Sequence, residues 1–160
     1  MNALENRLAE RLVRVFTEKG MTLSAAESCT GGLIAKLITD VPGSSAVFSG
    51  ACVSYTNDVK LRVLGVPRGV IERETEVSAA CAMAMAEGAR RLFKTDVAVS
   101  TTGFAGPSGG TPRDPVGTVY IGFATPLGTS CVRFSAPPES SREDVRIAAA
   151  IRAMEGVLER

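Results

Sequence analysis

The sequence predicts an α/β protein, built as a three-layer α/β/α sandwich around a mixed β-sheet. Segments with helical periodicity alternate with short runs rich in β-branched and aromatic residues, which is typical of strands joined by helices. Near the end of the chain, Pro126-Leu127-Gly128 separates two strand-like runs and predicts a hairpin, which an all-parallel sheet cannot contain. A length of 160 residues is typical of one domain, so residues 1–160 are expected to form a single unit.

The elements of the first half follow from periodicity and turn residues. Residues 1–19 carry leucines at helical spacing, and Gly20 supplies the stop. Turn signals such as Val41-Pro42-Gly43 separate the later segments. The next elements are expected to be a strand at residues 21–26, a helix at 33–39, a strand at 46–55 and a short helix at 57–64.

The second half begins with an alanine-rich helix. Ser78 is suited to cap this helix at residues 79–93, whose small side chains would let it approach a sheet closely. A strand at residues 96–102 then runs into a glycine-rich loop at residues 103–110. The remaining elements are expected to be hairpin strands at residues 116–124 and 129–134 and a final helix at 143–158.

Composition excludes several classes of partner. The hydrophobic fraction of 45% fits a compact soluble protein, and the net charge of +1 argues against nucleic acid or an anionic membrane as a partner. The first 19 residues are amphipathic rather than apolar, and no apolar run approaches the roughly 18 residues of a membrane span. We therefore expect a cytoplasmic protein without a membrane partner.

Metal and cofactor sites are not expected. The chain has no histidine, and its four cysteines are far apart and form no CxxC pair. Reduced, mostly buried thiols are the simpler interpretation of these cysteines. No nucleotide-cofactor fingerprint is present either, because the glycine-rich loop lacks both a Walker A ending and dinucleotide-fold spacing.

Ser28 is the first candidate for chemistry, in the segment Ala26-Glu27-Ser28-Cys29-Thr30-Gly31-Gly32 between a strand and a helix. At such a turn Ser28 could be a nucleophile, and the N–H groups of the four residues after it could bind an anion or oxyanion. The alternative is that Ser28 or Thr30 only caps the helix. Cys29 is a rival nucleophile, because a thiol at a helix N-terminus has a lowered pKa.

A serine nucleophile needs a base, and without histidine that base must be a lysine or tyrosine. Tyr55 ends a predicted strand, and Lys60 lies one turn into the helix that follows. Both could therefore lie at the same end of the sheet as Ser28. A lysine acts as base only if its pKa falls toward neutrality. The alternative is that Lys60 is an ordinary exposed lysine.

Two further segments could bind a phosphate or ribose. Thr102 could donate its hydroxyl at the start of the glycine-rich loop, and Arg142 begins the last helix, where an arginine fork suits a phosphate. The alternatives are a plain surface loop and a solvated arginine beside a serine cap.

Several blocks in order resemble the C-terminal domain family of the competence/damage-inducible protein CinA, whose stand-alone members include nicotinamide-mononucleotide amidohydrolases of the PncC type. The resemblance spans nearly the whole chain. The matching blocks are Ala26-Glu27-Ser28-Cys29-Thr30-Gly31-Gly32, Val53-Ser54-Tyr55 through Lys60, Leu64-Gly65-Val66, Val77-Ser78, Thr102-Gly103-Phe104-Ala105-Gly106-Pro107 and Pro115-Val116-Gly117-Thr118-Val119.

The resemblance implies a mixed five-stranded sheet and hydrolysis of the carboxamide of nicotinamide mononucleotide, without a metal and commonly in a homo-oligomer. It also implies the site residues. Ser28 would be the acylated nucleophile, Lys60 its base and Tyr55 a positioning or relaying hydroxyl. Substrate binding would fall to Cys29, Thr30, Gly31, Gly32, Thr102, Gly103, Ala105, Gly106 and Arg142.

The chain departs from the family pattern in two loops. The approach to Arg142 is longer and lacks the family's glycine, and Glu74-Thr75-Glu76-Val77 replaces a glycine-containing turn.

The alternative function is a catalytically weak nucleotide-binding or protein-interaction module linked to competence and DNA damage.

Overall fold

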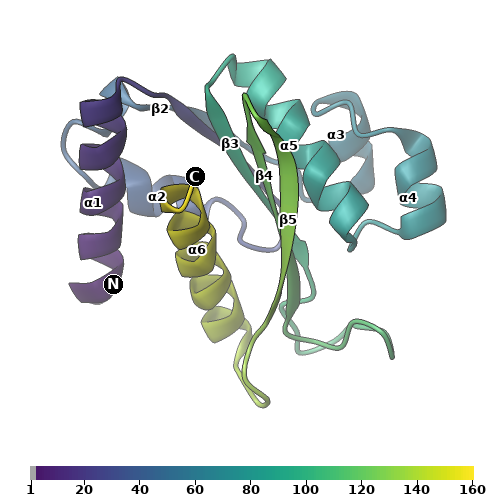
Figure 1. The fold of residues 1–160 in the computed structure, drawn as a ribbon. Helices are drawn as coiled ribbons and strands as arrows, with labels where there is room; N and C mark the ends of the chain where they lie inside the picture. Colours follow the sequence, from purple (N-terminus) through teal and green to yellow (C-terminus); the bar gives the residue numbers. More distant parts are fainter. Residues whose placement is uncertain (1–2) are drawn as a thin grey trace.

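The computed structural model describes residues 3–160 and shows an α/β sandwich of three layers (Figure 1). One mixed sheet of five strands has helices on both faces. The strands are β1 (Leu23–Glu27), β2 (Phe48–Val53), β3 (Val97–Gly103), β4 (Thr118–Thr125) and β5 (Gly128–Ser135). The helices are α1 (Ala3–Lys19), α2 (Leu33–Thr39), α3 (Asn57–Arg62), α4 (Arg68–Glu74), α5 (Ala79–Phe93) and α6 (Arg142–Leu158), with a 3₁₀ turn at Ser44–Ala46.

The strand order is β2-β1-β3-β4-β5, with β1 parallel to both of its neighbours. Strand β4 pairs antiparallel with both β3 and β5, which confirms the predicted hairpin and the mixed sheet. Because β1 lies between β2 and β3, the chain passes from β1 to β2 on one side of it and later forms β3 on the other side. Ligand sites in open α/β sheets commonly lie beyond the carboxyl ends of strands at such a point.

Alternate side chains of the strands supply two cores. Val97 and Val99 face α1, α2 and α6, whereas Ala98 faces α5. As predicted, α5 lies close to the sheet, because a side chain on Gly122 would meet the Ala82 carbonyl oxygen at 2.3 Å. These apolar layers fix the position of the strand ends, and the site is built on those ends.

The predicted elements are found with small shifts at their ends, and the helix α4 was missed. Strand β1 begins at Leu23 rather than at residue 21, and β2 covers only part of residues 46–55. Ser78 caps α5 as predicted by accepting a hydrogen bond from the Cys81 N–H. No helix within residues 3–160 is long and apolar enough to cross a membrane.

Candidate active site

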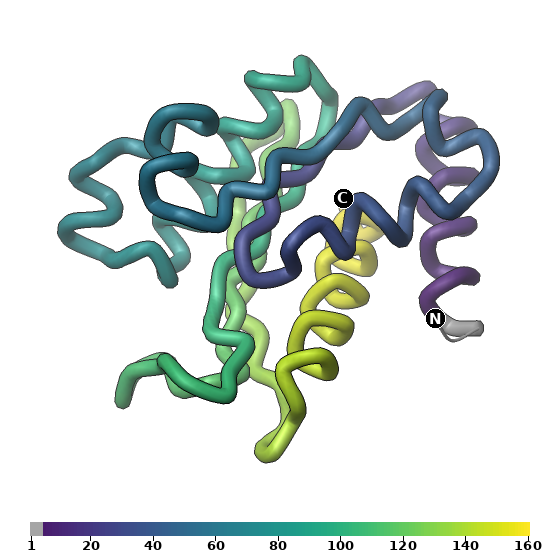
Figure 2. Tube along the Cα trace, turned by 180° about the vertical axis from the view of Figure 1, so that it is seen from behind, coloured from purple at the N-terminus to yellow at the C-terminus, as the bar shows by residue number. Residues whose placement is uncertain are grey.

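A cavity of about 350 Å³ lies beyond the carboxyl ends of β1, β2 and β3. Segments distant in sequence contribute to it, among them the turn after β1, the start of α3 and the glycine-rich segment after β3. In the view from behind, this glycine-rich segment projects from the end of the sheet beside the start of α6 (Figure 2). The predicted site residues that line the cavity are Ser28, Cys29, Tyr55, Lys60, Thr102, Gly103, Ala105 and Arg142.

The turn that carries Ser28 is shaped by Glu27, the last residue of β1. The fully buried Glu27 carboxylate accepts hydrogen bonds from the Thr30 hydroxyl at 2.6 Å and from the N–H groups of Gly32, Ile34 and Ala35. These groups belong to the turn and to the first residues of α2, so one carboxylate holds both. The Ser28 N–H donates to the Thr101 carbonyl, which fixes the serine against β3.

Neither Ser28 nor Thr30 caps α2, so that alternative was wrong. The capping position is Gly32, in the left-handed region at φ 94°, and no side chain of its own caps the helix. The helix is capped instead by the carboxylate of Glu27, which belongs to the preceding strand and accepts hydrogen bonds from the N–H groups of Ile34 and Ala35. The Ser28 hydroxyl is therefore free of a capping role.

Thr30, Gly31 and Gly32, predicted to bind substrate, do not line the cavity. The Thr30 hydroxyl and the Gly32 N–H donate to Glu27, and the Gly31 N–H donates to the Ser28 carbonyl. Their polar groups are thus used to build the turn. Gly106 also lies outside the lining, although its carbonyl accepts a hydrogen bond from Arg142 at 2.7 Å.

Lys60 lies within hydrogen-bonding distance of Ser28. Its side chain is buried, with 1% of the residue exposed, and its Nζ donates to the Ser28 Oγ at 3.2 Å and to the Ser54 carbonyl at 2.9 Å. Burial lowers the pKa of the Lys60 amine, because the charged form loses its hydration. The sequence-based alternative of an ordinary exposed lysine was therefore wrong.

Tyr55 and Arg142 meet at the mouth of the cavity. Tyr55 is 55% exposed, and its hydroxyl accepts a hydrogen bond from Arg142 Nη2 at 2.7 Å. Within residues 3–160 the Tyr55 hydroxyl makes no hydrogen bond to Ser28 or Lys60. The longer loop before Arg142 still delivers its guanidinium to the cavity, since Ser141 caps α6 in a capping box with Asp144.

The glycine-rich segment contributes backbone and shape. Gly103 is required there, because a side chain would meet the Thr118 carbonyl oxygen at 2.4 Å. The Thr102 hydroxyl donates to the Glu76 carbonyl at 2.6 Å, so its proton is already used within the protein. This corrects the expectation that Thr102 would donate to a ligand.

Cys29 is not an activated thiol. Burial, helped by the charge of Glu27, raises the pKa of the Cys29 thiol to about 12. The expectation of a lowered pKa failed because α2 begins only at Leu33 and the thiol is buried. Ser28 is thus the better-placed nucleophile.

Several residues of the site were not predicted. Glu27 is one of them, and its signal was a lone charge directly after the strand predicted at residues 21–26. Arg146 of α6 donates to the Thr30 carbonyl at 2.9 Å and thereby ties that helix to the serine turn. Asn57 and Glu76 line the cavity, and neither had a signal in the sequence.

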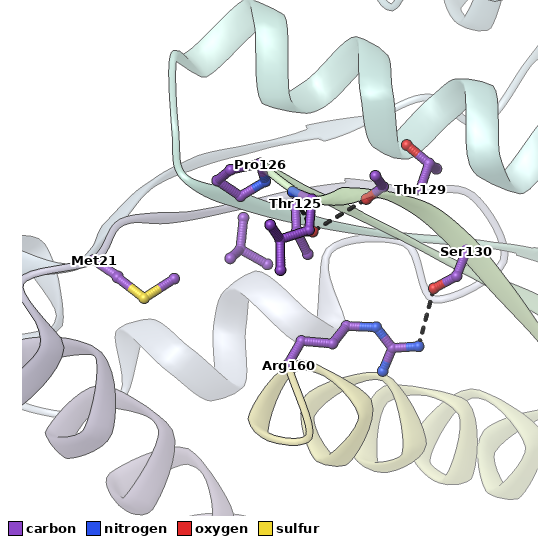
Figure 3. A pocket seen from close by; sticks show the side chains of 9 residues that line it. Met21, Thr125, Pro126, Thr129, Ser130 and Arg160 are labelled. Carbon is purple, nitrogen blue, oxygen red and sulfur yellow. Dashed lines mark hydrogen bonds between the residues drawn. The ribbon is translucent and has the colours of Figure 1, made fainter.

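Another cavity, of about 510 Å³, lies at the opposite end of the sheet (Figure 3). It is bounded by Met21, the β4–β5 turn and Arg160, whose guanidinium donates to Ser130 and lies 3.7 Å from the centre of the Phe123 ring. It contains no nucleophile paired with a base. Across residues 3–160 no cluster of three or more Cys, Asp or Glu side chains could hold a metal ion.

We expect Glu27→Gln to destabilise the protein strongly. The amide would place an NH₂ group against N–H and hydroxyl donors in a buried site, so the free energy of unfolding should fall by about 2–4 kcal/mol. Urea unfolding measures this loss. Glu18→Gln, on the exposed end of α1, is the matched control and should change stability by less than about 0.5 kcal/mol. An equal effect of both substitutions would contradict the role given to Glu27.

Comparison with known proteins agrees with this fold. The model of the CinA C-terminal domain matches residues 5–160. The chain belongs to the CinA C-terminal domain family. A CinA-like protein of Geobacter metallireducens is 49% identical over 144 residues, which are 90% of this chain and 34% of that protein. The chain therefore spans about a third of the length of the curated relatives it matches.

Solved structures of the CinA superfamily share the whole fold. The competence/damage-inducible protein CihA from Agrobacterium tumefaciens is 36% identical, with a TM-score of 0.95 over 99% of this chain and 96% of that one. A CinA superfamily protein from Escherichia coli is 26% identical, with a TM-score of 0.92 over 99% and 92% of the two chains.

Proposed function

We propose that this CinA-family domain hydrolyses the carboxamide of nicotinamide mononucleotide to nicotinate mononucleotide and ammonia. The observation that carries this proposal is the buried pair of Lys60 Nζ and Ser28 Oγ, 3.2 Å apart, at the wall of a cavity that Arg142 also lines. A nucleophile with an adjacent base is suited to acyl transfer, and an arginine fork is suited to a phosphate. The reaction needs no oxidation or reduction, only proton transfers.

In the first step Lys60 acts as the base. Its lowered pKa favours the neutral amine, and the hydrogen bond from Nζ to the Ser54 carbonyl orients that amine. Lys60 accepts the Ser28 proton as the Ser28 oxygen bonds to the carboxamide carbon. The N–H group of Cys29, which lines the cavity beside Ser28, makes no hydrogen bond with another residue of the described chain, and it can stabilise the oxyanion that forms.

The intermediate then collapses. Lys60 returns its proton to the departing nitrogen, the carbon–nitrogen bond breaks and ammonia leaves a nicotinyl ester on Ser28. In the second step Lys60 takes a proton from a water molecule, whose oxygen attacks the ester carbon. The ester bond breaks, the proton returns to the Ser28 oxygen and nicotinate mononucleotide is released.

Arg142 is placed to hold the phosphate. Arginine has five N–H donors, and its hydrogen bonds to Gly106 and Tyr55 occupy two of them. The remaining donors are available to an anion at the mouth of the cavity. Tyr55 then serves to position Arg142, a role that its contact supports better than a proton relay.

Ammonia release from nicotinamide mononucleotide, measured together with nicotinate mononucleotide and without added metal, tests the proposal. Equal amounts of both products from the native protein are expected. Binding of the nucleotide without either product would contradict the amidase and favour a nucleotide-binding module.

Arg142→Ala should raise KM about 10- to 100-fold and change kcat much less. The substitution removes a charge-assisted contact to the phosphate, whereas the Ser28–Lys60 pair stays intact. Steady-state kinetics with nicotinamide mononucleotide separates the two constants. Arg62→Ala, at an exposed ion pair with Asp58, is the control and should leave both unchanged. A fall in kcat alone would remove Arg142 from substrate binding.

The pH dependence of kcat should show a rising limb. A lysine base works only when deprotonated, so kcat is lost as pH falls through the pKa of Lys60, which burial places below the ordinary lysine value of about 10.4. The midpoint of the rise should therefore lie below that pH. Measuring nicotinate mononucleotide formation from about pH 6.5 to about pH 10.5 covers the window. A kcat that falls with rising pH would exclude Lys60 as base.

A further inference from the structure

The cavity contains a carboxylate that the mechanism does not use. Glu76 lies between α4 and α5 and lines the same cavity as Ser28 and Lys60. Its main chain is fixed there, because its carbonyl accepts the hydrogen bond from Thr102. Its carboxylate forms neither a hydrogen bond nor an ion pair with any residue in the range 3–160. The carboxylate is therefore available to a ligand.

Glu76 opposes the chemistry of its neighbour. Burial lowers the pKa of Lys60, and the Cys81 thiol, Glu76 and the Cys29 thiol act in the opposite direction. Burial raises the pKa of the two thiols to about 11 and about 12, so both are uncharged at neutral pH. Glu76 is the one carboxylate among these three groups, and it acts against the neutral state that a base lysine needs. This opposition indicates that the carboxylate has another partner.

We propose that Glu76 binds the cationic ring of a zwitterionic ligand whose anionic group is held by Arg142. The identity of that ligand rests on the proposed function. A nicotinamide ring substituted at its nitrogen carries a positive charge and bears the carboxamide directly. A group that recognises the ring must therefore lie near Ser28 and Lys60, as Glu76 does.

This arrangement couples binding to activation of the base. A cationic ring beside Glu76 neutralises the carboxylate and adds a positive charge near Lys60. Both effects favour the neutral amine, because nearby positive charge lowers the pKa of a lysine. Charged substrate would thereby promote the protonation state that its own hydrolysis requires.

The test compares two ligands of the same shape and different charge. Nicotinamide mononucleotide has a cationic ring, and its reduced dihydropyridine form has a neutral ring with the same carboxamide, ribose and phosphate. Calorimetric titration into Ser28→Ala protein measures the Kd of each without turnover. Adding Glu76→Gln should weaken binding of the cationic form about tenfold, or about 1.4 kcal/mol, and change binding of the neutral form less than about twofold. Glu72→Gln, an exposed carboxylate of α4, is the control and should change neither.

The outcomes separate this inference from the proposed function. Equal weakening of both ligands, or no weakening of either, would overturn the role of Glu76 even if the native protein releases ammonia. Charge-selective binding without ammonia release would support Glu76 and contradict the amidase. Failure of the Ser28→Ala protein to bind either form would overturn the cationic-ring subsite together with the proposed substrate.

Discussion

Replacing Ser28 with alanine should lower kcat for ammonia release by at least about 10⁴-fold, because no covalent intermediate can form. Binding should survive, since Arg142 and the glycine-rich segment remain in place. Steady-state kinetics and titration with nicotinamide mononucleotide measure the two effects. Ser28 lies in a turn held by Glu27 rather than by its own hydroxyl, so the variant should also keep its unfolding midpoint.

Cys29→Ser is the matched control for this variant. It alters the neighbouring rival nucleophile by one atom, and a thiol whose pKa is raised to about 12 is not expected to take part in the reaction. Turnover should therefore stay within about threefold of the native rate. Retained activity in Ser28→Ala with lost activity in Cys29→Ser would transfer the nucleophile to Cys29.

Replacing Lys60 with methionine should lower kcat by about 10²- to 10⁴-fold with little change in KM. Methionine fills a similar volume but cannot accept the Ser28 proton. It also leaves the Ser54 carbonyl without its hydrogen bond, so urea unfolding must accompany the kinetics. Lys19→Met, at the exposed end of α1, is the control and should leave kcat unchanged.

Chemical rescue distinguishes a base from a structural lysine. In Lys60→Ala, small primary amines could enter the space left beside Ser28 and restore part of the rate. The restored rate should increase with the fraction of amine that is neutral, because only the neutral form accepts a proton. A folded Lys60→Met or Lys60→Ala protein with native kcat would exclude Lys60 from proton transfer.

The sequence was sufficient to predict the layers and the proximity of Ser28 and Lys60. Apolar periodicity and turn residues determine strands such as β1 and β3 and the hairpin of β4 and β5, because those patterns depend on local geometry. The placing of Ser28 and Lys60 at one sheet edge followed from the parallel strands that precede them. The helix α4 was not predicted, because none of its residues is buried and it has no strong apolar stripe.

The details of the serine turn depend on contacts that the sequence does not encode locally. The hydroxyl of Thr30 and the N–H of Gly32 seemed available to a ligand, but both donate to the buried carboxylate of Glu27. The thiol of Cys29 looked reactive near a helix start, but tertiary packing buries it. Such outcomes follow from side chains brought together by folding, so no single-sequence pattern reports them.

Mass spectrometry of the native protein, quenched with acid during turnover of nicotinamide mononucleotide, tests the serine acyl-enzyme most directly. We expect a covalent adduct with the mass of the substrate less ammonia on the peptide that contains Ser28, and no such adduct in Ser28→Ala. An adduct that persists in Ser28→Ala, or full turnover by a native protein that never carries one, would contradict the mechanism.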